Sequence, residues 1–238
     1  MRDLPLAMII QKELKHGSIC RTKGVNCYRL TINNYEGLIL TAIILNGNMR
    51  TPKINNLNHL IDWLNIKFIN LNIVKYELNI SLLSSDSWLS GFIDADGHFF
   101  VNTSKKSISC GFELVQSSID KQGFSKLELM ESLAQFLKVK LGKNTRKKYP
   151  TYLEYRVRTS SLNNNSILID YIKNYPLFSS KYLNYKDWLN VIDIIKLNNH
   201  KKESGKLKIG FIRDGMNDRR KKFIWDHLNN FIICINKI

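Results

Sequence analysis

The stretch WLSGFIDADGHFFVN, residues 88–102, decides the fold of this chain. Its apolar residues recur at helical spacing as far as Ile93, and beyond Gly97 the pattern becomes that of a strand. Two acidic residues, Asp94 and Asp96, stand where the helix is expected to end. The stretch therefore predicts a helix that delivers carboxylates to the start of a strand.

The chain carries a large excess of positive charge. Its 238 residues include 36 Lys and Arg against 20 Asp and Glu, a formal net charge of +16. This balance predicts nucleic acid as the leading partner, with an anionic membrane surface second and a solvated basic surface as the plain alternative. The sequence has neither a run of about 18 apolar residues nor a basic amphipathic helix, so no membrane partner is predicted.

Composition also indicates the cellular setting. The four cysteines are scattered without CxxC spacing, which argues against a zinc site or a disulfide framework and favours a reducing compartment. The first residues, MRDLPLAMII, lack the features of a signal or transit peptide. Asn, Ile, Leu and Lys are frequent and Pro occurs four times, a bias expected of an AT-rich genome such as that of an organelle.

An internal repeat organises the chain. Residues 27–65 align with residues 154–190 when small insertions are allowed. The matched residues are Tyr28 with Tyr155, Lys53 with Lys181, and Trp63 with Trp188. Two copies of one structural unit are therefore expected.

Each copy is predicted to contain a helix, a pair of strands and two further helices. The predicted helices are residues 4–17, 34–45 and 54–64 in the first copy, and 125–142, 163–174 and 181–195 in the second. Only the second copy opens with an additional helix, strand, hairpin and strand, over residues 88–118. The basic stretch 201–222 is open to two interpretations, a phosphate-contacting element or a solvated surface.

The nine residues LSGFIDADG, 89–97, closely resemble the motif of the LAGLIDADG homing endonucleases. The tandem copies and the segments DLPLA, NGNMRTPK and LFSSK also resemble this family, most of all its two-repeat members encoded in mitochondrial group I introns. The resemblance implies an α/β (α+β) fold in which two pseudo-symmetric αββαββα-type repeats form a DNA-binding saddle. It divides the chain into an incomplete first repeat at 1–66 that lacks its motif helix, a linker at 67–87 and a complete second repeat at 88–238.

The same resemblance implies site-specific cleavage of double-stranded DNA by metal-dependent phosphodiester hydrolysis. In the family the acid before the terminal glycine binds the divalent cation, and Asp96 holds that position; Mg2+ suits carboxylate, phosphate and water oxygens. Gln116 matches a polar residue that orients solvent. Lys181 and its repeat mate Lys53 match basic residues that stabilise charge at the scissile phosphate. Asp94 is expected to cap or stabilise local structure instead.

The family pairs two motif helices along their small residues, and Ser90 and Gly91 would permit such close packing here. Two acids, one from each half, would form the cleavage site. The other motif helix is expected either upstream in a longer intron-encoded reading frame or from a second polypeptide or chain. The alternative is a non-cleaving nucleic-acid-binding protein, such as a maturase that binds group I intron RNA. The resemblance further implies a mitochondrial, organelle-encoded protein.

Alternation along the predicted strands indicates which side chains face DNA, because one strand face packs inward and the other meets the major groove. The predicted contacts are Asn102, Ser104, Ser107, Ser109, Glu113, Arg156 and Arg158 in the second copy, and Arg21, Lys23, Arg29, Thr31 and Asn33 in the first. A basic hairpin tip is expected to meet phosphate instead. Its residues are Lys143, Arg146, Lys147 and Lys148.

Overall fold

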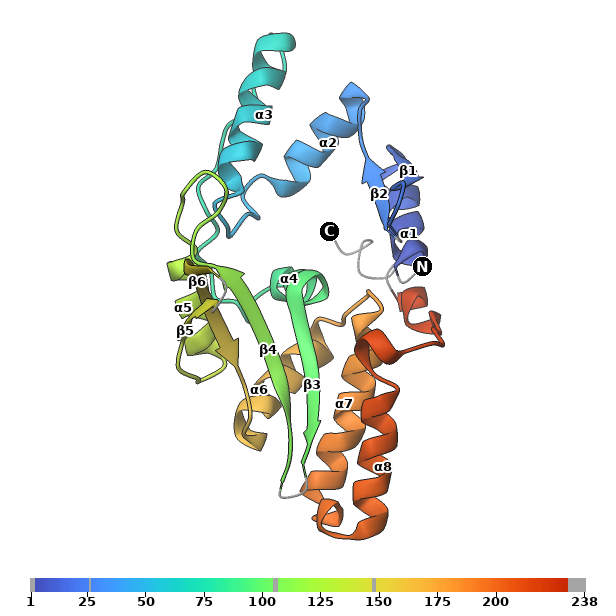
Figure 1. Ribbon diagram of the computed structural model, residues 1–238. Coiled ribbons are helices and arrows are strands. Elements are labelled where there is room, and N and C mark those ends of the chain that lie inside the picture. Colours follow the sequence, from blue (N-terminus) through green and yellow to red (C-terminus); the bar gives the residue numbers. More distant parts are fainter. Residues whose placement is uncertain (1–2, 26, 105–106, 147–148, 231–238) are drawn as a thin grey trace. The chain divides into compact units, whose positions relative to one another are not determined.

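A computed structural model describes residues 3–25, 27–104, 107–146 and 149–230. The chain forms two compact units, the first made of residues 1–82 and 120–129 and the second of residues 83–119 and 130–238. Figure 1 shows the elements of each unit. None of the described helices combines the length and the apolar character needed to cross a membrane.

The first unit consists of a helix, a strand hairpin and two further helices. Its elements are α1 (Leu4–Leu14), β1 (Ser18–Arg21), β2 (Tyr28–Thr31), α2 (Tyr35–Leu45) and α3 (Ile54–Lys67). The two strands pair in antiparallel fashion, with Cys20 opposite Arg29. Apolar residues three and four positions apart on α3 meet α2, since they share one helix face. The buried core of this unit includes Ala42, Leu57, Ile61 and Leu64.

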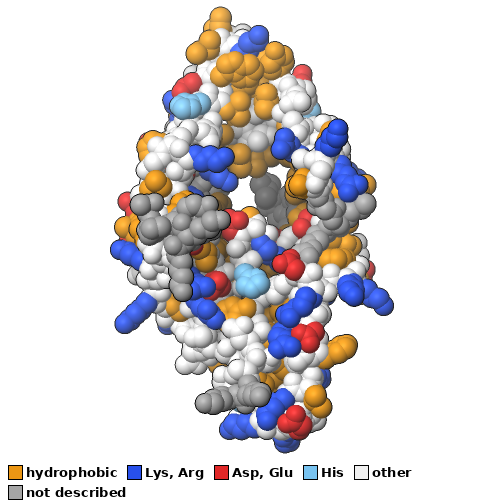
Figure 2. Space-filling view, viewed as in Figure 1, with side chains coloured by type: hydrophobic (Ala, Val, Ile, Leu, Met, Phe, Trp, Pro, Cys, Tyr) orange, Lys and Arg blue, Asp and Glu red, His pale blue; other side chains and the backbone are white. Residues whose placement is uncertain are grey.

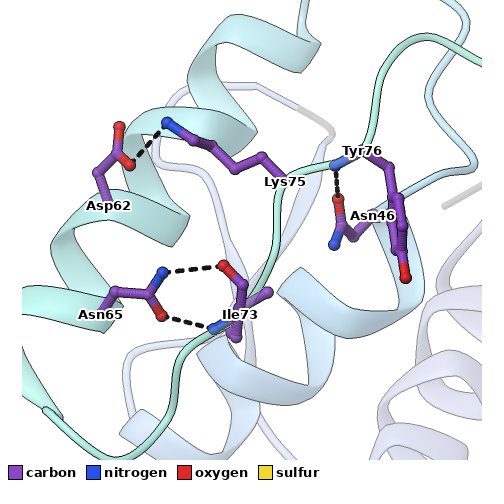
Figure 3. A network of polar contacts seen from close by, with 6 residues as sticks. All are labelled: Asn46, Asp62, Asn65, Ile73, Lys75 and Tyr76. Carbon is purple, nitrogen blue, oxygen red and sulfur yellow. Dashed lines mark hydrogen bonds and ion pairs between the residues drawn. The ribbon is translucent and has the colours of Figure 1, made fainter.

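An extended segment, residues 73–82, is fixed to α2 and α3 by polar contacts rather than by a strand ladder (Figure 3). Asn65 binds both backbone groups of Ile73: its Nδ2 donates to the carbonyl at 2.9 Å and its Oδ1 accepts from the amide at 2.8 Å. Lys75 lies 2.7 Å from the carboxylate of Asp62. These contacts hold the start of the segment against α3.

Two further side chains hold the rest of this segment. The Oδ1 of Asn46 accepts a hydrogen bond from the amide of Tyr76 at 3.0 Å. Arg50 is only 7% exposed, and its guanidinium donates to the carbonyl of Ser81 at 2.5 Å and to the Ser81 hydroxyl at 2.7 Å. The interval expected to be a linker therefore contains a stretch that belongs to the first unit.

Part of the apolar surface of the first unit is exposed. Hydrophobic side chains gather over α2 and α3 in Figure 2. Exposed members include Ile43 and Ile44 on α2 and Ile66 on α3. Trp63 of α3 is 44% exposed, whereas its repeat mate Trp188 in the second unit is fully buried. The two copies therefore share a sequence pattern, but matched residues are not buried to the same extent.

The second unit contains a four-stranded antiparallel sheet and the helices that cover it (Figure 1). The strands are β3 (Gly97–Thr103), β4 (Ile108–Ser117), β5 (Gly142–Arg146) and β6 (Tyr149–Arg158), in the order β3-β4-β6-β5. The α-helices are α4 (Trp88–Asp96), α5 (Leu127–Phe136), which starts in the first unit's 120–129 segment, α6 (Leu162–Asn174), α7 (Lys181–Lys196) and α8 (Glu203–Asp214). Short 3₁₀-helices are η1 (Asn199–Lys201), η2 (Asn217–Arg219) and η3 (Asp226–Asn230).

The sheet has an apolar face and a polar face. Phe99 pairs with Phe112 across β3 and β4, and both side chains are buried on the face that α7 covers. The ring of Trp188 on α7 lies 5.2 Å from that of Phe99. Since neighbouring residues of a strand point to opposite faces, His98 and Glu113, which also pair, lie on the other face.

The predicted helices and strands are confirmed in both copies. α1, α2, α3, α5, α6 and α7 correspond to the six predicted helices, and α4 is the predicted helix before Gly97. Their ends differ where the backbone turns left-handed: α1 stops at Leu14 because Lys15 has φ 57°, and Lys138, with φ 54°, follows the end of α5. The basic stretch 201–222 contains α8 and η2, which the sequence pattern did not assign.

The small residues of α4 have two different environments. Ser90 is 3% exposed, its hydroxyl donates to the carbonyl of Tyr175, and its amide donates to the hydroxyl of Tyr171 at 3.1 Å. The prediction that Ser90 lines a contact with a second motif helix is therefore wrong, because the side chain is used against the end of α6. Gly91 is exposed, and within the described residues no heavy atom beyond its chain neighbours and its own helix backbone lies within 4 Å of the place where a Cβ would stand.

Candidate functional site

The candidate acidic site lies where α4 passes into β3. Asp96 is the last residue of α4, and its side chain is exposed. Its Oδ2 accepts a hydrogen bond from Nε2 of Gln116 at 2.9 Å. Gln116 lies on β4, two residues beyond Leu114, which pairs with Gly97. The structure thus brings together two residues that the family resemblance nominates.

The passage from helix to strand requires a glycine at position 97. A Cβ there would stand 2.8 Å from the carbonyl oxygen of Ile93 and 2.8 Å from the ring of Phe112. Contacts this short force the surrounding atoms to move, so any other residue would push the helix end away from β4. The position of Asp96 next to Gln116 depends on this close packing.

Asp94 turns away from the acidic site and holds the start of α7. Its Oδ2 accepts a hydrogen bond from the amide of Phe178 at 2.8 Å, and its Oδ1 accepts one from the hydroxyl of Ser179 at 2.5 Å. Burial raises the pKa of the Asp94 carboxyl, and the hydrogen bonds from Ser179 and Phe178 oppose that rise. The prediction that Asp94 stabilises local structure is confirmed.

Lys181, the first residue of α7, caps the C-terminal end of α4. Its Nζ donates to the carbonyls of Ile93, Asp94 and Ala95 at 3.2, 2.9 and 2.7 Å. The last carbonyls of a helix have no partner within it and carry partial negative charge, which an ammonium group satisfies. Lys181 therefore caps the end of α4 and fixes the turn that carries Asp96, while Asp94 binds the residues just before α7.

The acidic site offers one carboxylate to a divalent cation. Among the residues that the structure describes, no three His, Cys, Asp or Glu side chains form a metal-binding group. Mg2+ is commonly held by one or two carboxylates, with phosphate oxygens and water in the remaining positions. An exposed Asp96 with one oxygen engaged by Gln116 fits this open type of site rather than a closed one.

The polar face of the sheet collects most of the residues predicted to face DNA in the second copy. Asn102 pairs with Ser109, and Glu113 pairs with Arg158. Arg156 lies two residues from Arg158 on the same strand and so shares its face. The carboxylate oxygen Oε2 of Glu113 lies 2.8 Å from Nε of Arg156 and 3.5 Å from a guanidinium nitrogen of Arg158. DNA contact by this face stays a prediction.

The residues predicted near the β3–β4 and β5–β6 turns do not all lie on the polar face. Ser104 and Ser107 hydrogen-bond each other, with the amide of Ser107 donating to Oγ of Ser104 at 3.0 Å, so they close the β3–β4 turn. Lys143 lies near the start of β5 and not, as predicted, at the hairpin tip. It pairs with Tyr155, so it lies on the sheet face opposite to that of Arg156. Arg146 ends β5, and its side chain lies outside the described residues. Lys147 and Lys148 also lie outside them.

The remaining candidates belong to the first unit and do not all share one face. Cys20 pairs with Arg29 and Ser18 with Thr31, which puts Arg29 and Thr31 on one side of the hairpin. Arg21 pairs with Tyr28 and lies on the opposite side. Lys23 is in the connecting turn, Asn33 follows β2, and Lys53 precedes α3; all three are exposed.

Two residues of the polar face were missed at the level of sequence. His98 lies opposite Glu113, and burial lowers the pKa of its imidazole. Phe100 lies beneath Arg158, whose guanidinium carbon is 4.2 Å from the ring centre. Counting back from Asn102 in steps of two along the strand would have found both, because period-two alternation fixes the face.

Two comparisons with known proteins decide the family. The family model described as LAGLIDADG endonuclease matches residues 89–192. Over 116 residues the chain is 30% identical to a probable intron-encoded DNA endonuclease aI1 of Mycosarcoma maydis, a match that covers 49% of this chain and 94% of that protein. The chain belongs to the LAGLIDADG endonuclease family. The family model spans all of α4 except Trp88, together with α6 and most of α7, two helices that contact α4.

Longer relatives match this LAGLIDADG chain over most of its length. It is 28% identical over 264 residues to the intron-encoded DNA endonuclease aI3 of Saccharomyces cerevisiae, covering 97% of this chain and 64% of that protein. It is 30% identical over 210 residues to an uncharacterized cox1 intron-2 protein of Schizosaccharomyces pombe, covering 85% of this chain and 60% of that protein. The chain thus spans less than two thirds of the length of these two relatives.

Solved structures confirm the predicted LAGLIDADG homing endonuclease fold. The meganuclease I-SmaMI bound to DNA is 19% identical with a TM-score of 0.63, and the match covers 92% of this chain and 84% of that one. The homing endonuclease I-GzeII in complex with its DNA target is 20% identical with a TM-score of 0.61, covering 93% and 87%. At these identities the likeness establishes the fold alone.

Proposed function

We propose that this LAGLIDADG chain takes part in site-specific cleavage of double-stranded DNA as a homing endonuclease. The observation that carries the proposal is the pair of Asp96 and Gln116 at the end of α4, in the same unit as the polar sheet face with Arg156 and Arg158. Arginines bind phosphate, and an acid can hold a cation against it. Relatives named as DNA endonucleases support the proposal.

The cofactor we propose is Mg2+, with Asp96 as its protein ligand. When bound, the ion would stabilise charge on the phosphate and lower the pKa of a bound water. Gln116 orients the carboxylate by donating to its Oδ2. Lys181 and Asp94 act as positioning residues, because they hold the turn that carries Asp96. Lys53 is the corresponding candidate of the first unit.

Cleavage of both strands needs a second acid. Among the described residues, Asp96 is the acid that ends a motif helix, and Gly91 on the same helix is exposed, with no outside contact within 4 Å of a Cβ built there. We propose that a second polypeptide or chain supplies a motif helix there together with its acid. Close packing of helices along small residues is a known mode of helix association.

The test compares the wild type with Asp96→Asn on a randomised duplex library, scoring binding in Ca2+ and both nicks and double-strand breaks in Mg2+. Loss of the carboxylate removes its repulsion of phosphate, so the variant is expected to bind at least as tightly while cleavage disappears. Near-wild-type cutting by Asp96→Asn would overturn the assignment of Asp96. Nicks without double-strand breaks would support a second acid from another chain.

The polar face would also suit the phosphates of intron RNA, since phosphate contacts carry no sequence information. Tight binding of nucleic acid by the wild type without cutting in any divalent cation would therefore favour the maturase alternative.

The location we propose is mitochondrial. It is supported by the composition of the chain and by its likeness to a protein named after a cox1 intron.

A further inference from the structure

A cavity of about 220 Å³ opens at the outer edge of the sheet in the second unit. One wall is the polar side of β3, with His98 and Asn102, and the other is the end of α8 with the turn that follows it. The second wall includes Arg213, Met216, Asn217, Asp218 and Arg219. Neither Asp96 nor Gln116 is among the lining residues, so the cavity is separate from the acidic site.

The turn after α8 is anchored to the body of the unit. Asn217 has a left-handed φ of 55°, its amide donates to Oδ1 of Asn184 on α7 at 2.9 Å, and its Nδ2 donates to the carbonyl of Phe99 on β3 at 3.0 Å. Met216 is 1% exposed beneath the turn. The turn therefore holds the next residues at a defined place beside β3.

This edge of the unit carries excess positive charge. Residues 213–222 contain five Arg and Lys against two Asp. The carboxylate of Asp214 lies 2.9 Å from a guanidinium nitrogen of Arg213 and 3.3 Å from one of Arg219, so two cations share a single acid. Arg219 is 56% exposed, and ion pairs between side chains this exposed contribute little to stability. Its guanidinium can therefore turn to a stronger anion at small cost.

The place of the cavity matches the dimensions of duplex DNA. Neighbouring strands lie about 4.8 Å apart, so a four-stranded sheet is roughly 14 Å wide between its outer strands. The major groove is about 12 Å wide. A sheet that lies in the groove therefore brings an edge strand close to a sugar–phosphate backbone. β3 is such an edge strand, and the cavity lies on its polar side.

We propose that this cavity binds one backbone phosphate of duplex DNA, with Arg219 as the principal cation and Arg213 held in place to support it. Arg213 is fixed by its bonds to Asp214 and to the hydroxyl of Thr103 on β3. Asn102 supplies amide N–H donors at the opposite wall. The inference rests on the proposed function and names a contact that sets affinity and orientation rather than sequence.

The experiment measures the affinity of the full chain for a mixed-sequence DNA duplex over a series of salt concentrations. Arg219→Gln removes the proposed contact. The matched control is Lys173→Gln, which removes the same charge from a 67% exposed lysine that also pairs with an aspartate, Asp170. Lys173 lies on α6, whose Asn165 is buried against the sheet and donates to the carbonyl of Cys110 on β4. Lys173 is therefore a control on a helix that does not line the cavity.

Arg219→Gln is expected to lower the slope of log K against log salt by about 0.9, the value for one phosphate contact, and to weaken binding equally for all sequences. Lys173→Gln should leave the slope unchanged. Equal slopes for Arg219→Gln and the wild type would overturn the inference while leaving the proposed function intact. A wild type whose binding does not depend on salt would instead overturn the proposed DNA-binding function.

Discussion

Replacing Lys181 with methionine tests whether this residue acts through α4. The substitution keeps most of the side-chain volume and removes the ammonium that donates to the carbonyls of Ile93, Asp94 and Ala95. If Lys181 is a positioning residue, the last turn of α4 should open more often. Asp96 would then lose its fixed place beside Gln116.

The magnitude follows from the geometry. A hydrogen bond to a charged group contributes about 1.5–3 kcal/mol, and a partly buried cation at a helix C-terminus contributes up to about 2 kcal/mol. The three bonds share one half-buried ammonium, so their contributions are not summed. A loss of about 2 kcal/mol corresponds to roughly a thirtyfold change in the opening equilibrium.

Native-state amide hydrogen exchange measures this opening directly, because it reports on local unfolding. Amides in the last turn of α4 are expected to exchange about thirtyfold faster in Lys181→Met than in the wild type. Lys186→Met, at an exposed position on the same helix, is the control and should change exchange little. Equal exchange at α4 in the two variants would refute the capping role.

Three further perturbations have defined outcomes. Burial raises the pKa of Asp94 above its ordinary 3.8, so the stability linked to its protonated form is present below about pH 3.8 and is lost as the pH rises. Urea titrations should therefore show the free energy of unfolding of the wild type falling relative to that of Asp94→Asn as the pH rises. A difference that does not change with pH would contradict this. Glu113→Gln removes the acid that pairs with Arg156 and Arg158, so duplex DNA should bind about fivefold more tightly at low salt. Weaker binding would instead indicate that Glu113 contacts a base. Arg50→Met removes buried hydrogen bonds that fix residues 73–82 and should accelerate trypsin cleavage after Lys75 at least about tenfold; an unchanged rate would mean that other contacts suffice.

Sequence pattern was sufficient for the elements and for most of the polar sheet face, because both depend on spacing along the chain. Period-two alternation placed Asn102, Glu113 and Arg158 correctly, since β3, β4 and β6 are regular over that stretch. The same rule failed at Arg21, where the face depends on how the turn closes β1 onto β2. When turn geometry decides which face of the hairpin a side chain lies on, a strand of four residues is too short for the sequence to show it.

Contacts between distant residues were beyond the reach of pattern. A serine in a helix has the same spacing whether it faces a partner helix or, like Ser90, donates to a carbonyl of another element. A lysine at a helix start reads as an exposed cation, yet Lys181 reaches back to α4 across more than eighty residues. Residues 74–82 alternate apolar and polar side chains, a pattern typical of a strand, yet they pair with no strand. Side-chain hydrogen bonds from Asn65 and Arg50 hold the backbone of this segment instead.

The repeat shows why local structure and burial are predicted unequally well. Trp63 and Trp188 occupy matched positions on helices that both formed as expected. Trp188 is buried because Phe99, from the strand that follows α4, packs 5.2 Å away, while Trp63 stacks on Tyr35 at 6.1 Å and remains 44% exposed. Repeating a sequence repeats its helices, since those follow from spacing within the copy. Burial of the same residue needs a partner that lies outside the matched segment, and within the described residues only the second unit provides one.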